Sequence, residues 1–231
     1  MGTTIYCDRP PEAKEKEKVG TVIKVDVEKI VILKPDLILA TSLTDPGQIE
    51  KLKSLGIRVI SFPLYKNENF SQICEQFMEI GRIVGKEEEA EEIVRQMKNK
   101  IDSISKKVKG LPRSKVFVQI GARPLFAITK DSFIQDLITL AGGISTTREA
   151  KSGLYSREDV IRQNPEVIII VTMGIVGEEE KKIWKRFKTL DAARNDRIYI
   201  IDSNKTCSPT PVSFVEALEE ITEFLHPEER N

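Results

Sequence analysis

Two segments of the chain repeat one pattern of apolar and polar positions. VEKIVILKPDLILAT at 27–41 and REDVIRQNPEVIIIVT at 157–172 each place spaced apolar residues before a proline and an apolar run after it. Pro35 and Pro165 correspond at an offset of 130 residues. Proline disfavours helix at the preceding residue, and a strand that is apolar on both faces is typical of a covered parallel sheet. Each segment therefore predicts a helix followed by a buried strand.

Both segments continue in the same way along the chain. The first predicts a helix at 47–55 and a strand at 58–62, and the second predicts a helix at 179–187 and a strand at 197–201. Strands that alternate with helices indicate βαβ units and parallel sheets. Right-handed crossovers then bring the carboxyl ends of the strands in each lobe to one edge.

A long helical stretch separates the two repeats. Its apolar residues recur at spacings of three and four, which indicates one helical face; they are Ile73, Phe77, Ile80, Val84, Ile93, Val94, Met97, Ile101, Ile104 and Val108. Gly85 divides the stretch, and a helix over 87–108 would be about 33 Å long. A coiled coil is the alternative, although the repeat lasts only about three heptads.

These patterns predict an α/β fold with two Rossmann-like lobes, whose parallel sheets are joined by a helical backbone. The expected divisions are 1–69 for the first lobe, 70–112 for the backbone and 113–231 for the second lobe. The second lobe adds strands at 115–120 and 125–128 and a helix at 133–141, which have no counterpart in the first. We therefore expect an incomplete first lobe; the alternative is that the lobes were never equal. An open sheet edge there would favour self-association.

Composition and motifs exclude several classes of function. The 231 residues carry 36 Lys plus Arg and 36 Asp plus Glu, and this zero net charge argues against a general nucleic-acid binder. Three scattered cysteines without a CxxC pair indicate neither a zinc ribbon nor a disulfide framework. No GxGxxG, phosphate-binding lysine loop or GxSxG elbow occurs. No apolar run reaches about 20 residues, and residues 1–20 lack the apolar core of a signal peptide.

Residues that follow the predicted strands are the candidates for ligand binding, because open α/β sheets bind ligands at that edge. They are small, hydroxylic, aromatic or cationic, without an evident acid–base pair, which favours recognition over catalysis. Arginine can hold an oxyanion in a fork, and tyrosine can stack on a flat ligand; an exposed loop arginine and packed tyrosines are the alternatives. The candidates are Tyr6, Thr41, Ser42, Tyr65, Arg123, Tyr155, Met173, Lys205 and Ser208.

Several motifs, in order, resemble the helical-backbone substrate-binding proteins of ABC importers (cluster A, type III). In the first lobe they are IYCDRPPEA at 5–13 with KVG at 18–20, EKI through KPDLILA at 28–40, and LGIRV at 55–59. In the second they are NPEVII at 164–169 and AARNDRIY at 192–199. The similarity covers essentially the whole chain.

The resemblance implies a transport protein and not an enzyme. Such proteins bind a ferric siderophore, haem or cobalamin between the lobes and deliver it to a membrane permease. The ligand itself is then the metal chelate, and no resident cofactor is expected. A sister group binds bare zinc or manganese through several histidines, which the single His226 disfavours. The remaining alternatives are a cleft enzyme and a cytoplasmic sensor with the same two lobes.

Partner contacts and location also follow from the resemblance. Acidic residues at the lobe tips of such proteins contact permease arginines, and the candidates are Asp45, Glu50, Glu178 and Glu179. The run at 178–180 is otherwise interpreted as the negative first turn of a helix. The family lies in the periplasm or on the extracytoplasmic surface. Its members begin with a signal peptide, a strand and a helix before the segment that resembles residues 2–13, so we expect those parts to be missing here.

Overall fold

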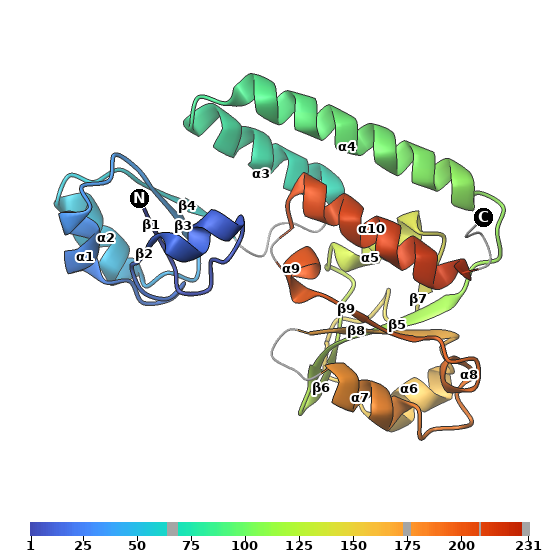
Figure 1. Cartoon of the computed structure of the whole chain (residues 1–231). Coiled ribbons are helices and arrows are strands. Elements are labelled where there is room, and N and C mark those ends of the chain that lie inside the picture. The colour runs from blue at the N-terminus through green and yellow to red at the C-terminus, as the bar shows by residue number, and fades with distance from the viewer. Residues whose placement is uncertain (64–68, 173–176, 208, 228–231) are drawn as a thin grey trace. The chain divides into compact units, whose positions relative to one another are not determined.

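The computed structural model describes residues 1–63, 69–172, 177–207 and 209–227. The chain forms two compact units, Met1–Lys66 and Asn67–Asn231 (Figure 1). Each unit is described by itself. The predicted candidates Tyr65, Met173 and Ser208 lie outside the described residues.

The N-terminal unit contains two short parallel sheets, in which β1 pairs with β2 and β3 pairs with β4. Helix α2 connects β3 to β4, and its Leu52 is almost fully buried. Asp45 caps α2 by accepting a hydrogen bond from the Gln48 amide, and Pro46 occupies the first turn, which suits a residue without an N–H. The elements are β1 Gly2–Thr3, a 3-10 helix Pro11–Glu15, β2 Glu17–Lys18, α1 Val27–Ile32, β3 Ile38–Thr41, α2 Pro46–Ser54 and β4 Val59–Phe62.

The second unit is built around a five-stranded sheet with the order β6-β5-β8-β9, in which β7 also pairs with β5. β7, β5, β8 and β9 are parallel, whereas β6 runs antiparallel to β5. The elements are α3 Phe70–Ile83, α4 Glu87–Val108, β5 Lys115–Ala122, β6 Leu125–Ala127, α5 Ile134–Leu140, β7 Ile144–Ser145, α6 Arg157–Gln163, β8 Val167–Val171, α7 Gly177–Trp184, α8 Asp191–Arg194, β9 Ile198–Ile201, α9 Ser203–Thr206 and α10 Pro211–Leu225.

Helices cover both faces of this sheet (Figure 1). α4, α5 and α10 lie over one face, and α6, α7 and α8 lie over the other. The sequence of strand β8 is an unbroken apolar run because both of its faces are buried. Ile169 and Val171 pack in the core on the α4, α5 and α10 side, and Ile168 and Ile170 pack in the core on the α6, α7 and α8 side. Burying each such side chain contributes about 1.5–3 kcal/mol. The predicted α/β class with parallel sheets and a long helix is confirmed.

Helix α4 spans the predicted residues and is long because its inner face is apolar throughout. Its buried positions lie three or four residues apart, at Ala90, Val94, Met97, Ile101, Ile104 and Val108. They pack against α3 and α10 within the second unit. Gly85 and Gly110, both with positive φ, follow the ends of α3 and α4. The three-part division of the chain proposed from the sequence stays a prediction.

The internal repeat extends to backbone conformation. Lys34 and Asn164, which stand before the two matched prolines, both adopt left-handed backbone, with φ of 46° and 45°. The preceding helices α1 and α6 end just before these residues, and β3 and β8 follow them. The predicted helix, proline and strand pattern is therefore confirmed in both units. Among the described helices, none combines the length and apolarity that crossing a bilayer requires.

Candidate functional site

The strands of the second unit end at an edge that carries several of the predicted residues. Arg123 lies in the turn between β5 and β6 and is exposed. Thr172 follows β8, and its hydroxyl oxygen accepts a hydrogen bond from the Ser203 amide at 3.2 Å. This bond ties the end of β8 to the start of α9. The edge therefore offers one exposed guanidinium beside an ordered turn.

Tyr155 is half-buried, and its ring is partly used by the core. The ring lies edge-on to Phe117, with centroids 5.9 Å apart and an interplanar angle of 60°. Its backbone amide donates to the Leu125 carbonyl at 3.0 Å, which holds the residue beside β6. The ring therefore packs against the core, and a contact of Tyr155 with a ligand stays a prediction.

Lys205 is not a free cation. Its ammonium lies 2.6 Å from a carboxylate oxygen of Glu220 on α10, and both side chains are 27% exposed. Glu220 was not among the residues expected from the sequence. Its carboxylate offsets the charge that Lys205 would present to an anionic ligand, so Arg123 is the stronger candidate for oxyanion binding.

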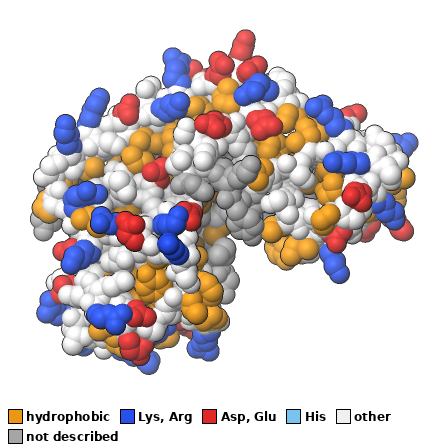
Figure 2. Space-filling view, turned by 180° about the vertical axis from the view of Figure 1, so that it is seen from behind, with side chains coloured by type: hydrophobic (Ala, Val, Ile, Leu, Met, Phe, Trp, Pro, Cys, Tyr) orange, Lys and Arg blue, Asp and Glu red, His pale blue; other side chains and the backbone are white. Residues whose placement is uncertain are grey.

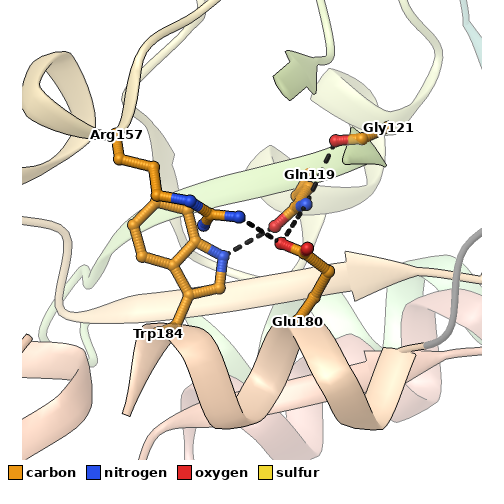
Figure 3. Close-up of polar contacts among 5 residues, drawn as sticks. All are labelled: Gln119, Gly121, Arg157, Glu180 and Trp184. Carbon is orange, nitrogen blue, oxygen red and sulfur yellow. Dashed lines mark hydrogen bonds and ion pairs between the residues drawn. The ribbon is translucent and has the colours of Figure 1, made fainter. Parts of the chain in front are cut away.

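A buried polar network lies beneath this edge (Figure 3). One Glu180 oxygen accepts hydrogen bonds from Gln119 at 2.8 Å and from Arg157 at 2.6 Å. The indole N–H of Trp184 donates to the Gln119 side-chain oxygen at 2.6 Å, and the Arg157 guanidinium lies 4.6 Å from the centre of the indole ring. Glu180 is 4% exposed and Trp184 is fully buried, whereas the Arg157 side chain is 22% exposed.

The network fixes two features of the edge. Gln119 also donates to the carbonyl of Gly121, at the point where the register between β5 and β6 shifts, two residues before Arg123 (Figure 3). Glu180 holds the rotation of α7 about its axis, which leaves Glu178 and Glu179 exposed. The predicted negative first turn is present, but Glu180 is buried and paired, because it faces the sheet.

In the N-terminal unit, Tyr6 is exposed, with 68% of its surface accessible. Thr41 is half-buried, and its hydroxyl oxygen accepts a hydrogen bond from the Leu43 amide at 3.3 Å. Ser42 is exposed, as are Asp45 and Glu50 on α2. One carboxylate oxygen of Asp45 caps α2 by accepting a hydrogen bond from the Gln48 amide at 3.0 Å.

Shifted pKa values do not single out an acid–base pair among the described residues. The hydrogen bond from Lys86 lowers the pKa of Glu89, and one from Ser156 lowers that of Asp159. Burial raises the pKa of the Cys74 thiol to about 11. No group of three His, Cys, Asp or Glu side chains within the described ranges is placed to hold a metal ion. Charges of both signs are interspersed over the face shown in Figure 2.

An open groove of about 460 Å³ lies between α3 and α4, away from these residues. Cys74, Met78 and Val94 line it together with charged side chains of both signs. None of the residues predicted to bind ligand or permease lines this groove. We assign it no role in ligand binding.

The residues of the buried polar network around Glu180 were not predicted from the sequence. Gln119 could have been found from the sequence, because it is a polar residue within the apolar run of β5 and a buried amide needs hydrogen-bond partners. Glu180 is indistinguishable in sequence from the exposed glutamates beside it. Arg157 resembles an ordinary first-turn residue of α6.

Comparison with known proteins places the whole chain among binding proteins. A family model described as "Periplasmic binding protein" matches residues 1–205. The chain is 26% identical over 238 residues to the uncharacterized ABC transporter substrate-binding lipoprotein YvrC of Bacillus subtilis, covering 99% of this chain and 73% of that protein. It is 30% identical over 181 residues to a vitamin B12-binding protein of Salmonella choleraesuis, covering 77% of this chain and 66% of that protein.

A solved structure shares the fold. It is that of a possible iron-binding (periplasmic solute-binding) protein from Staphylococcus epidermidis, with a TM-score of 0.84 and 24% sequence identity. The match covers 98% of this chain and 90% of that one. The α/β architecture derived above is therefore the fold of a solute-binding protein.

Proposed function

The chain belongs to the periplasmic binding protein family, and from this premise we propose that it is the substrate-binding component of an ABC importer. It is a binding protein and not an enzyme. The observation that carries the proposal is the family match over residues 1–205, together with a relative that is a vitamin B12-binding protein. The lipoprotein named among the relatives supports a place outside the cytoplasmic membrane.

We propose an iron chelate, a siderophore or haem, or a cobalamin-like compound as the ligand. Large planar or macrocyclic ligands are recognised by aromatic faces and a few polar groups. Tyr6 and the half-buried Tyr155 are the aromatic candidates, and Arg123 is the cation for a carboxylate or phosphate group. A ligand of this class brings its own metal coordination, so the protein needs no dedicated metal centre.

Two observations argue against a bare transition metal as the ligand. Such ions are commonly held by several imidazole and carboxylate groups. His226 is the single histidine of the chain. Its ring nitrogen Nε2 lies 2.9 Å from the carbonyl oxygen of Ala141, at the carboxyl end of α10, so it is engaged in the fold.

The partner of the loaded protein would be a membrane permease. Exposed carboxylates on helices of both units support this proposal: Asp45 and Glu50 on α2, and Glu178 and Glu179 on α7. The buried Glu180 network supports α7 from below, which limits the positions that Glu178 and Glu179 can adopt. Complementary charge of this kind raises association rates and sets the register of a complex.

A thermal-shift titration tests the ligand class. Cyanocobalamin, hemin and a ferric siderophore are each added to the protein, with ATP, NAD and zinc chloride as comparisons. A ligand at 100 times its dissociation constant adds about 2.7 kcal/mol of stability, which corresponds to roughly 5–10 °C in a chain of this size.

Two variants locate the binding site. Arg123→Ala should abolish most of the shift, whereas Arg148→Ala, which removes another exposed guanidinium on the loop after β7, should leave it unchanged. Stabilisation by nucleotides or zinc alone would overturn the proposed ligand class, as would a lack of response to all three chelates. Equal losses in the two variants would overturn the assignment of Arg123.

A further inference from the structure

The ammonium of Lys18 forms a three-point contact inside the N-terminal unit. Lys18 Nζ donates hydrogen bonds to the Thr3 hydroxyl at 3.0 Å, the Cys7 carbonyl at 2.9 Å and the Ala13 carbonyl at 2.9 Å. An ammonium has three donors, and these contacts use all of them. The three acceptors are neutral oxygens, and the side chain is half-buried.

The three acceptors lie in one loop and in the strand residue that directly precedes it. This loop, residues 4–16, connects β1 to β2 and carries Tyr6. Thr3 stands at its start, Cys7 follows Tyr6 directly, and Ala13 lies beyond the proline pair in a buried position. The Thr3 hydroxyl also lies 3.4 Å from the Ala13 carbonyl. One ammonium therefore joins the beginning, the middle and the far arm of the loop.

Backbone contacts alone hold the loop only loosely near its tip. The Ile5 amide donates to the Gly20 carbonyl at 2.9 Å, and the Cys7 amide donates to the Thr4 carbonyl at 3.1 Å. Ile5 and Tyr6 nevertheless expose 53% and 68% of their surfaces, so little apolar packing orders them. Hydrogen bonds from a charged donor are stronger than those between neutral groups, which makes Lys18 a strong polar support of this segment.

We propose that Lys18 is a positioning residue for ligand binding, whose ammonium orders the loop that presents Tyr6 to the ligand. The proposal rests on the proposed function for the role of Tyr6, but not for the ordering of the loop. Lys18 acts through the Cys7 carbonyl, which is adjacent to Tyr6 in the chain, rather than by touching the ligand. The ammonium of Lys18 therefore stabilises the loop. The neighbouring Lys14 and Lys16 are exposed, whereas Lys18 is half-buried.

Hydrogen–deuterium exchange tests the ordering of the loop. Lys18→Met keeps the length of the side chain and removes the three donors, whereas Lys16→Met makes the same charge change at an exposed neighbour. Peptides that cover residues 4–13 should exchange roughly tenfold faster in Lys18→Met and unchanged in Lys16→Met. Thr3→Val, which removes one acceptor and keeps the shape, should shift the same peptides to a smaller extent. Equal exchange in Lys16→Met and Lys18→Met would overturn the proposal.

A double-mutant cycle tests whether Lys18 acts through Tyr6. Affinity is measured for whichever of cyanocobalamin, hemin and the ferric siderophore stabilises the wild-type chain. Lys18→Met and Tyr6→Ala should each weaken binding by roughly tenfold, which is 1.4 kcal/mol, and the double variant should bind no more weakly than either. Additive losses, or full affinity in Lys18→Met, would refute the positioning role. If none of cyanocobalamin, hemin and the ferric siderophore binds the wild type, the proposed function fails, and exchange still decides whether Lys18 orders the loop.

Discussion

Removal of the Glu180 carboxylate is the sharpest test of the second unit. Glu180→Ala leaves the Arg157 guanidinium, which is 22% exposed and whose Nη1 has no hydrogen-bond partner among the described residues, without its counter-charge. It also removes one of the two acceptors of the Gln119 amide. Breaking a buried ion pair from one side costs about 3–5 kcal/mol, and the partial exposure of Arg157 places this case near the lower end.

Trp184 supplies the assay. It is the only tryptophan of the chain, is fully buried and donates to Gln119 within the same network. Urea unfolding followed by its fluorescence therefore reports the second unit directly. A loss of about 3 kcal/mol should lower the melting temperature by roughly 6–12 °C.

Three variants separate charge from shape. Glu179→Ala, the exposed neighbour on α7, should change the unfolding free energy by no more than about 0.5 kcal/mol. Glu180→Gln keeps the shape and one acceptor and should lose less than Glu180→Ala. The pair Glu180→Leu with Arg157→Met should recover most of the loss, because no unpaired charge remains buried. Equal stability of Glu180→Ala and Glu179→Ala would refute the reasoning.

Four further predictions concern single residues. Maleimide should label Cys74 far more slowly than Cys7 at pH 8, since burial raises the pKa of Cys74 to about 11; equal rates by peptide mass spectrometry would contradict this. Ser156→Ala should cost α6 about 1 kcal/mol in urea unfolding by loss of its cap, and an unchanged midpoint would argue against it. The pKa of Asp159 is lowered from 3.8, so its stabilisation is present above pH 3.8 and is lost as pH falls through the lower folded-state pKa; Asp159→Asn should remove this acid dependence. Asn164→Ala should lower the free energy of unfolding by about 1–2 kcal/mol, because left-handed backbone is unfavourable for alanine. An unchanged melting temperature in calorimetry would contradict this prediction.

The elements predicted well from the sequence are those that depend on near neighbours along the chain. The apolar residues on the buried face of α4 recur at spacings of three and four, and the helix begins and ends at the predicted residues. The repeated proline pattern predicted both helix ends and both following strands. The prediction departs from the structure at α7, which spans Gly177–Trp184 and not 179–187.

The candidate site was predictable only in part. Tyr6, Ser42 and Arg123 are exposed, as loop residues after strands should be. Lys205 was named as a cation, but its charge is met by Glu220, fifteen residues further along. No pattern in the sequence indicates that Lys205 and Glu220 form an ion pair.

The sequence by itself determined the fold class, the long helix and the internal repeat, because helix and strand periodicity and proline geometry act within a few residues. It also pointed, through resemblance, to the family that the comparisons confirm. Only the tertiary structure decided that Gln119 contacts Glu180, 61 residues away, and that Lys18 binds the Thr3 hydroxyl and two carbonyl oxygens of the following loop. A buried charge or amide takes its partner from whatever the packed elements bring within about 3 Å, and that proximity is a property of the folded chain.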